Sequence, residues 1–422
     1  MLTSDARVGG VAFTGSTETA LKIRSAMVKN LAPGAPLIAE TGGLNAMIVD
    51  STALPEQAVQ AIVESAFQSA GQRCSALRCL YVQEDIADDF TEMLTGAMDA
   101  LVVGTPWNLA TDCGPVIDEE ARAGIADHIQ QARGEGRLLH ELKTPNAGTY
   151  IAPTLIKVGG IADLKREIFG PVLHIATYKA RDLDRVIDAI NATGYGLTFG
   201  LMTRIDDRVQ HVTEAVHAGN IYVNRNQIGA IVGSQPFGGE GMSGTGPKAG
   251  GPHYLARFQA HPAPQEGAKW EAAMPVASAQ AALDRANATP HTAREALVLP
   301  GPTGESNRLT THLRPALLCL GPGKDAAEAQ KRAVEELGGI AVAATGRVDP
   351  EALVTMGGLS GALWWGDEAD ARAYADALAR RAGPIVPLIT GLPDLGHALL
   401  ERHVCVDTTA AGGNAALLGG MS

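Results

Sequence analysis

The sequence lacks several features that mark common classes of protein. Among its 422 residues no basic run is longer than two residues, and the formal net charge is -12, which disfavours phosphate backbones and anionic membranes as partners. No apolar run reaches membrane-spanning length. The N-terminus also lacks the charged and then apolar layout of a secretion signal. We therefore expect a soluble cytoplasmic protein that binds no nucleic acid and spans no membrane.

Cysteine is scarce and irregularly spaced. The five cysteines form no CxxC pair and are Cys74, Cys79, Cys113, Cys319 and Cys405. An odd number at irregular spacing fits reduced thiols better than a disulfide framework or a zinc site. We therefore expect no bound metal.

Length and periodicity predict an α/β protein with two or three domains, built mainly on parallel strands. Glycine-ended strands alternate with apolar stripes at helical spacing over the first 260 residues. Strands are expected at 8–14, 36–39, 46–49, 77–83 and 219–224 and near 138 and 172, and helices at 18–30, 59–70, 86–101, 118–132, 182–191 and 206–218. A strand, a glycine turn and a helix so near the start resemble a fold entered midway.

The composition changes at about residue 261, where prolines and then alanines predict a linker and one helix up to about residue 290. A smaller doubly wound α/β domain is expected beyond it. Its strands are predicted at 316–320, 340–344, 361–365 and 385–389, and its helices at 325–337 and 368–380. Gly301-Pro302-Thr303-Gly304 lacks the spacing of a dinucleotide fingerprint.

A carboxylate and a thiol beside glycines form the main candidate site. Glu40 precedes Thr41-Gly42-Gly43, and Cys74 follows Gly71-Gln72-Arg73. A thiol can attack a carbonyl carbon, and a carboxylate can deprotonate the water that later cleaves the thioester. Cysteines are more often buried and inert, but the neighbouring Arg73 or nearby amide dipoles would favour a reactive thiolate. The nearly uncharged segment around Glu40 predicts a raised pKa for this carboxyl group.

Thiol chemistry on an aldehyde also needs a hydride acceptor, for which nicotinamide is suited. Gly15 and Ser16 follow a strand and precede a helix, so their region offers free backbone N–H groups to a pyrophosphate.

Seven motifs in order resemble those of the NAD(P)-dependent aldehyde dehydrogenases. They are Phe13-Thr14-Gly15-Ser16-Thr17-Glu18, Glu40-Thr41-Gly42-Gly43, Gly71-Gln72-Arg73-Cys74, Thr111-Asp112-Cys113-Gly114-Pro115, Pro153-Thr154-Leu155, Glu167-Ile168-Phe169-Gly170-Pro171 and Pro236-Phe237-Gly238-Gly239. The resemblance covers about residues 1–260. It implies Cys74 as nucleophile, Glu40 as base for thioester hydrolysis, and NAD along Gly15 and Ser16 with its nicotinamide riboside at Glu167 and Phe169.

Within that family the chain resembles the L-glutamate γ-semialdehyde dehydrogenase part of the PutA proline utilisation proteins. The resemblance rests on 73–78, 228–233 and 239–252, and residues from about 275 to 422 resemble the extra C-terminal domain of longer PutA proteins. It implies a small aldehyde substrate bearing an α-carboxylate. Ser75 with the amides of Gly229 and Ala230 would hold that carboxylate, and Phe237 would pack on the aliphatic part.

The resemblance also implies a division of the chain. We expect an NAD-domain remnant at 1–45, a catalytic domain at 46–260, a linker and helix at 261–290, an α/β domain at 291–400 and a tail at 401–422. The family's first NAD-domain strands do not precede Met1, so we expect a fragment of a larger protein with little activity by itself. Expected protein partners are further copies of the chain or an upstream proline dehydrogenase region. Another aldehyde, NADP, or a catalytically silent structural role remain alternatives.

Overall fold

The computed structural model describes residues 2–259, 261–264, 269–288 and 295–409. These residues form two compact units. Unit 1 comprises residues 1–41, 236–297 and 309–402, and unit 2 comprises residues 42–235, 298–308 and 403–422. Both units are interrupted in sequence, so chain order alone does not delimit either of them.

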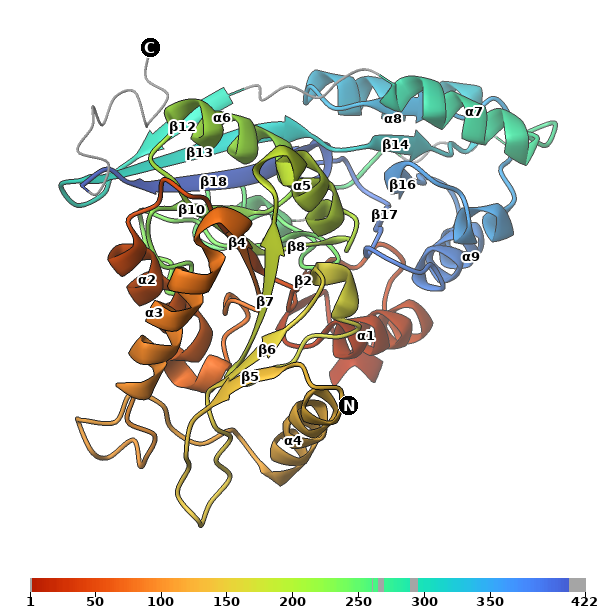
Figure 1. Ribbon diagram of the computed structural model, residues 1–422. Helices are drawn as coiled ribbons and strands as arrows, with labels where there is room; N and C mark the ends of the chain where they lie inside the picture. The colour runs from red at the N-terminus through yellow and green to blue at the C-terminus, as the bar shows by residue number, and fades with distance from the viewer. Residues whose placement is uncertain (1, 260, 265–268, 289–294, 410–422) are drawn as a thin grey trace. The chain divides into compact units, whose positions relative to one another are not determined.

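Unit 2 is built on a largely parallel sheet (Figure 1). Its strand order is β10-β9-β3-β4-β7-β6-β5, and only the β5–β6 pairing is antiparallel. The strands and helices are β3 (Ala46–Val49), α2 (Pro55–Phe67), β4 (Cys79–Gln83), α3 (Ala87–Asp99), α4 (Glu119–Gly134), β5 (Leu138–Glu141), β6 (Thr154–Lys157), β7 (Val172–Tyr178), α5 (Leu183–Asn191), β8 (Tyr195–Gly196), β9 (Thr198–Met202), α6 (Asp206–Ala215) and β10 (Asn220–Val223).

Helices cover both faces of this sheet. Met47 and Val49 of β3 pack in one cluster with side chains of α2 and α3, whereas Ala46 and Ile48 pack in another with α4, α5 and α6. Successive strand residues point to opposite faces, so burial on both sides explains why β3 reads as an unbroken apolar run. Figure 1 shows α2 and α3 side by side on one face. The predicted parallel α/β architecture is confirmed here.

Unit 1 contains two parallel sheets, β1-β2 and β15-β14-β16-β17. Their elements are β1 (Val11–Thr14), α1 (Thr17–Asn30), β2 (Leu37–Glu40), α7 (Val276–Asn287), β14 (Ala316–Cys319), α8 (Gly323–Glu336), β15 (Ala341–Ala343), β16 (Leu359–Leu363), α9 (Glu368–Ala379), β17 (Leu388–Ile389) and α10 (Leu395–Ala398). A two-residue strand, β11, comprises Glu240–Gly241.

The four-stranded sheet of unit 1 is doubly wound, as predicted. Leu318 of β14 packs in a cluster with side chains of α7 and α9, while Leu317 and Cys319 pack with Val334 of α8. Helices therefore lie on both faces of this sheet.

Three strands to which the sequence pattern assigned no element contain residues of both units. They are β12 (Glu295–Leu299), β13 (Glu305–Leu313) and β18 (Leu399–Asp407). Residues His403–Val406 of β18 pair in parallel with Asn220–Val223 of β10. The expected tail at 401–422 therefore begins as a strand, and its small residues 410–415 lie outside the described residues. The expected five-part division of the chain stays a prediction. No helix in the described ranges has the length and apolar character needed to cross a bilayer.

Candidate active site

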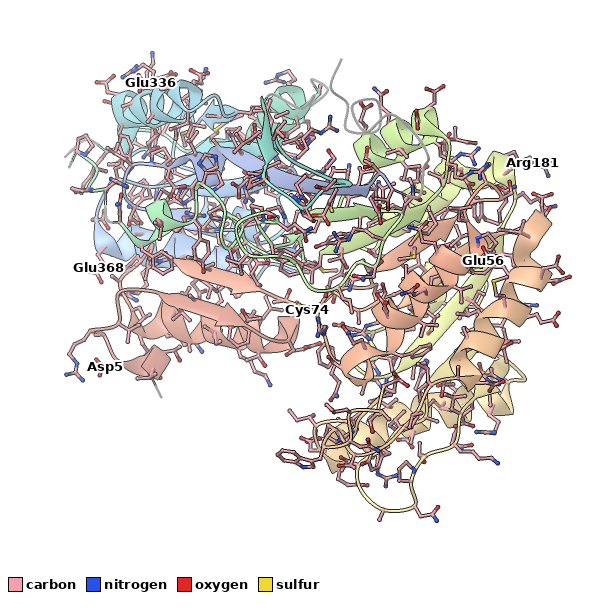
Figure 2. The ribbon with its side chains drawn as sticks, turned by 90° about the vertical axis from the view of Figure 1, so that its left-hand side faces the viewer. Asp5, Glu56, Cys74, Arg181, Glu336 and Glu368 are labelled. Atoms are coloured by element: carbon pink, nitrogen blue, oxygen red, sulfur yellow. The ribbon has the colours of Figure 1, made fainter. Side chains whose placement is uncertain are left out.

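Cys74, which is labelled in Figure 2, follows a tight, left-handed segment of backbone in unit 2. Helix α2 ends at Phe67, and Ser69 and Ala70 then adopt φ of 56° and 54°. Non-glycine residues with such backbone are uncommon and cost on the order of 1–3 kcal/mol each. Gly71 continues the turn at φ 65°, and a Cβ there would lie 2.2 Å from the carbonyl oxygen of Gly170. Strain of this kind is concentrated at functional sites.

The buried amide of Asn45 fixes the backbone around the thiol. Its Nδ2 donates to the carbonyls of Cys74 (2.7 Å) and Ala76 (2.9 Å), and its Oδ1 accepts from the N–H of Thr198 (3.2 Å). One side chain just before β3 thereby holds the backbone on the C-terminal side of Cys74. No motif in the sequence had pointed to Asn45.

The guanidinium of Arg78 is the centre of the site in unit 2. It is completely buried and donates through Nη1 to the carbonyl of Gly71 (2.7 Å) and through Nη2 to that of Arg73 (3.2 Å). Its Nε and Nη2 both reach Oε1 of Glu167, at 3.3 and 3.0 Å. The same cation therefore binds the turn before Cys74 and the predicted cofactor-binding carboxylate.

Arg78 also interacts electrostatically with Cys74. Burial lowers the pKa of the guanidinium, and the charges of Glu167 and Cys74 oppose that shift. Since the interaction between two charges is mutual, the cation favours the thiolate of Cys74 over the thiol. Arg73, the neighbouring cation expected from the sequence, donates through Nε to Ser69 Oγ (3.1 Å), and its effect on Cys74 stays a prediction. The structure thus identifies Arg78 as a cation that acts on the thiol.

Glu167 and Phe169 meet at the same guanidinium. The Arg78 Cζ lies 5.3 Å from the ring centroid of Phe169, a distance suited to a cation–π contact. A Cβ on Gly42 would lie 1.9 Å from Oε2 of Glu167, so this position admits only glycine unless the carboxylate moves. The Glu167 side chain is 21% exposed and Phe169 is 44% exposed, which leaves both accessible to a ligand.

The predicted substrate residues are divided between the units. Ser75 is buried, and its carbonyl accepts from Thr198 Oγ1 (3.1 Å) and Gln227 Nε2 (3.2 Å). A Cβ built on Gly229 would lie 3.6 Å from Arg73 Nη1. The guanidinium of Arg73, which was not part of the predicted clamp, therefore lies beside the Gly229 backbone. The clamp of Ser75, Gly229 and Ala230 remains a prediction.

In unit 1, Gly15 and Ser16 join β1 to α1. The N–H of Gly15 donates to the carbonyl of Glu40 (3.1 Å), and a Cβ on Gly15 would meet the Phe13 ring at 2.4 Å. Ser16 is the N-cap of α1, and its Oγ accepts from the N–H of Thr19 (3.2 Å). Its hydroxyl therefore has a structural role whether or not a cofactor binds there.

Glu40 has the raised pKa predicted from its surroundings. Burial raises the pKa of this carboxyl group to about 8, although the N–H of Gly239 donates to Oε2 (2.8 Å) and the charge of Lys248 acts in the opposite direction. Lys248 is itself 2% exposed, and its Nζ donates to the carbonyl of Gly238. Burial lowers the pKa of Lys248 to about 8, against the charges of Glu40 and Glu401. The sequence analysis had missed Lys248, which lies far away along the chain.

Glu40 and Cys74 belong to different units, and so do Gly15 and Glu167. Phe237 likewise lies in unit 1, where it exchanges backbone hydrogen bonds with Ala249. The convergence of these residues on one pocket is therefore still a prediction. Within the described ranges, no three His, Cys, Asp or Glu side chains are grouped to hold a metal ion.

Comparison with known proteins supplies the family. The model of the aldehyde dehydrogenase family matches residues 1–261. The chain therefore belongs to the aldehyde dehydrogenase family.

Within the family, the chain is similar to PutA proteins and to a 1-pyrroline-5-carboxylate dehydrogenase. It is 43% identical to the bifunctional protein PutA of Salmonella typhimurium, over 99% of this chain and 36% of that protein. It matches the crystal structure of Bradyrhizobium japonicum PutA with a TM-score of 0.60 and 54% identity, over 61% of this chain and 26% of that one.

A 1-pyrroline-5-carboxylate dehydrogenase from Thermus, solved with bound NAD, matches with a TM-score of 0.56 and 36% identity, over 61% of this chain and 50% of that one. By length, the chain covers only about a third of the PutA relative from Salmonella typhimurium.

The role of Arg78 is testable through the reactivity of Cys74. Replacing Arg78 by Met removes the cation, so the thiol pKa should rise and alkylation by iodoacetamide at pH 7 should slow by about tenfold or more. Mass spectrometry of the labelled peptide measures this rate, and the other four cysteines are buried.

Two further variants separate charge from fold. Arg78→Lys keeps a cation and should retain most of the reactivity, and Arg73→Met should change it little. Equal alkylation rates in folded wild type and Arg78→Met, checked by circular dichroism, would contradict the assignment.

Proposed function

We propose that the chain carries the catalytic residues of an NAD-dependent L-glutamate γ-semialdehyde dehydrogenase, as part of a bifunctional PutA-type protein. Membership of the aldehyde dehydrogenase family supports this proposal. The observation that carries it is the buried guanidinium of Arg78, which acts on Cys74 and binds Glu167.

The first half of the proposed reaction takes place at Cys74. Its thiolate Sγ forms a bond to the aldehyde carbon, and the carbonyl oxygen takes up the negative charge. Loss of hydride from that carbon leaves a thioester on the sulfur. NAD, when bound, would supply the acceptor for the hydride.

The described residues fit such a cofactor. The partly exposed Glu167 and Phe169, both held by Arg78, are suited to the ribose hydroxyls and the nicotinamide ring. The backbone N–H groups at the start of α1, next to Gly15 and Ser16, are suited to a pyrophosphate because the N-terminal end of a helix is positive. The Thermus relative was solved with NAD, which favours NAD over the alternative NADP.

The second half of the reaction is assigned to Glu40. Its carboxylate would remove a proton from water, whose oxygen attacks the thioester carbonyl, and the C–S bond then breaks to release the acid. A carboxyl pKa of about 8 suits a base that must also release its proton near neutral pH. Only Thr41 separates Glu40 from Gly42, the residue that abuts Glu167.

Substrate choice is assigned to the α-carboxylate of the aldehyde. Ser75 with the amides of Gly229 and Ala230 would bind it, and Phe237 would contact the aliphatic carbons. The guanidinium of Arg73 beside Gly229 adds a charge of the right sign for a carboxylate. An aldehyde without this group is the alternative substrate.

Ester hydrolysis tests both catalytic residues and needs no nicotinamide. With p-nitrophenyl acetate, Cys74 Sγ would displace p-nitrophenolate to give an acetyl thioester, which Glu40 would help water to cleave. Cys74→Ser should lose the initial burst of p-nitrophenolate. Glu40→Gln should keep the burst and lose steady turnover by about 10²- to 10⁴-fold.

Exposed Glu56→Gln is the matched control and should behave as wild type. Undiminished turnover in folded Cys74→Ser would refute the nucleophile, and undiminished turnover in Glu40→Gln would refute the base.

The pH dependence of steady turnover should follow Glu40. Because the base acts when it has lost its proton, turnover should rise as the pH increases through about 8. Lys248→Met removes a positive charge that lowers the pKa of Glu40, so the midpoint should move to higher pH. The exposed Lys157→Met serves as control, and a Lys248→Met midpoint at or below that of wild type would contradict the coupling.

Substrate recognition is testable by protection of Cys74. L-glutamate carries the expected α-carboxylate and should slow iodoacetamide alkylation of Cys74, whereas pentanoate should not. Arg73→Met should weaken the protection by roughly tenfold, since a charge-assisted hydrogen bond is worth on the order of 1.5–3 kcal/mol. Equal protection by the two compounds would favour another aldehyde.

A further inference from the structure

Unit 1 contains a cavity of about 550 Å³, a volume typical of small-molecule sites. Its walls come from α1, from residues 32–38 up to β2, from residues 385–392 around β17, and from α10. None of Gly15, Ser16, Glu40 or Phe237 is among its lining residues. It is therefore distinct from the groups of unit 1 assigned to the dehydrogenase reaction.

Much of the wall is apolar. It includes Met27, Leu37, Ile38, Val386 and Leu388. Two lining segments approach each other closely at Gly391. A Cβ there would lie 2.3 Å from the carbonyl oxygen of His261, so the approach requires glycine. A hydrocarbon segment of a ligand would find contacts along this surface.

Arg24 is a buried cation in the wall of this cavity. It projects from the buried face of α1, is 6% exposed, and donates through Nη2 to the carbonyl of Val386. Its Nη1 is buried and has no hydrogen-bond partner among the residues that the structure describes. Burial lowers the pKa of Arg24 to about 10, and the nearby Arg381 lowers it in the same direction. A buried donor without an acceptor is costly, and a bound anion would remove that cost.

Arg257 and Arg314 bring two more guanidinium groups to the cavity. Arg257 contacts His397 and lies 3.5 Å from Asp394, while its buried Nε has no acceptor in the described part of the chain. Arg314 donates to the carbonyls of Leu399 (3.0 Å) and Thr245 (2.9 Å).

The charges around the cavity leave an excess of cation. Burial lowers the pKa of His397 to about 4, so this lining residue is neutral at pH 7. Burial would raise the pKa of Asp394, but hydrogen bonds from His397 and the charge of Arg257 hold it below its usual range. The negative charges of Glu240 and Glu401 also raise the pKa of Arg314. Glu240 accepts a hydrogen bond from Arg402, and Glu401 accepts one from the N–H of Lys248. Among the described residues that line the cavity, the carboxylate of Asp394 is thus accompanied by three arginines.

We propose that this cavity binds a small organic anion, whose carboxylate or phosphate group contacts the unpaired Nη1 of Arg24 and whose hydrocarbon part lies along Met27, Leu37 and Val386. Guanidinium groups form charge-assisted hydrogen bonds with either head group. The apolar walls disfavour a fully hydrated inorganic ion. The site does not depend on the proposed dehydrogenase function.

Titration calorimetry on the 422-residue chain tests the site with three probes. Octanoate and octyl phosphate distinguish the two head groups, and octanol shares their tail without a charge. At least one anion should bind at least tenfold more tightly than octanol. Arg24→Met should weaken that binding by about tenfold or more, Arg257→Met, which removes a second lining cation, should weaken it less, and Arg185→Met, which removes a guanidinium that is 85% exposed, should not weaken it.

A second measurement on the wild type does not depend on the folding of any variant. The anion that binds should slow amide hydrogen exchange in α1 and in residues 385–392. Failure of both anions to bind, octanol binding as tightly as the anions, unchanged affinity in folded Arg24→Met, or unchanged exchange in these segments would each overturn the proposal.

Discussion

One buried cation organises the catalytic part of unit 2. A guanidinium placed out of water is costly unless its donors are satisfied. Arg78 meets this requirement with the carbonyls of Gly71 and Arg73 and the carboxylate of Glu167. These are the same groups that shape the turn before Cys74 and position the predicted cofactor carboxylate. Satisfying one charge thus fixes the geometry of several functional residues.

The two proposed catalytic residues are tuned in opposite directions by their surroundings. A cation acts on Cys74, which favours loss of the thiol proton. Burial acts on Glu40 and favours retention of its proton, which makes the carboxylate a stronger base. Lys248 limits that second effect, because its charge stabilises the ionised carboxylate. A nucleophile that must lose its proton easily and a base that must bind a proton strongly can therefore act at the same pH.

The C-terminal α/β layer forms part of the wall of a cavity in unit 1. Residues 385–397 form part of the wall of the arginine-lined cavity, and they lie beyond the segment that matches the family model. The opposite wall comes from α1, which is inside that segment. The cavity is therefore lined by residues both inside and beyond the family match, and its helix α1 follows the predicted cofactor turn. Ligand binding there would stabilise this part of unit 1.

The sequence by itself determined the α/β class, most helices of both units and the family. These follow from local patterns, namely apolar periodicity, glycine turns and ordered motifs. It did not reveal β9, β13 or β18, whose pairing depends on segments far away in the chain. Nor did it reveal Arg78 as the cation acting on Cys74, Asn45 as the clamp on its backbone, or Lys248 as the partner of Glu40. Only the tertiary structure decided these three roles. Burial and electrostatic interaction depend on distance in space, which the separation of residues along the chain does not reveal.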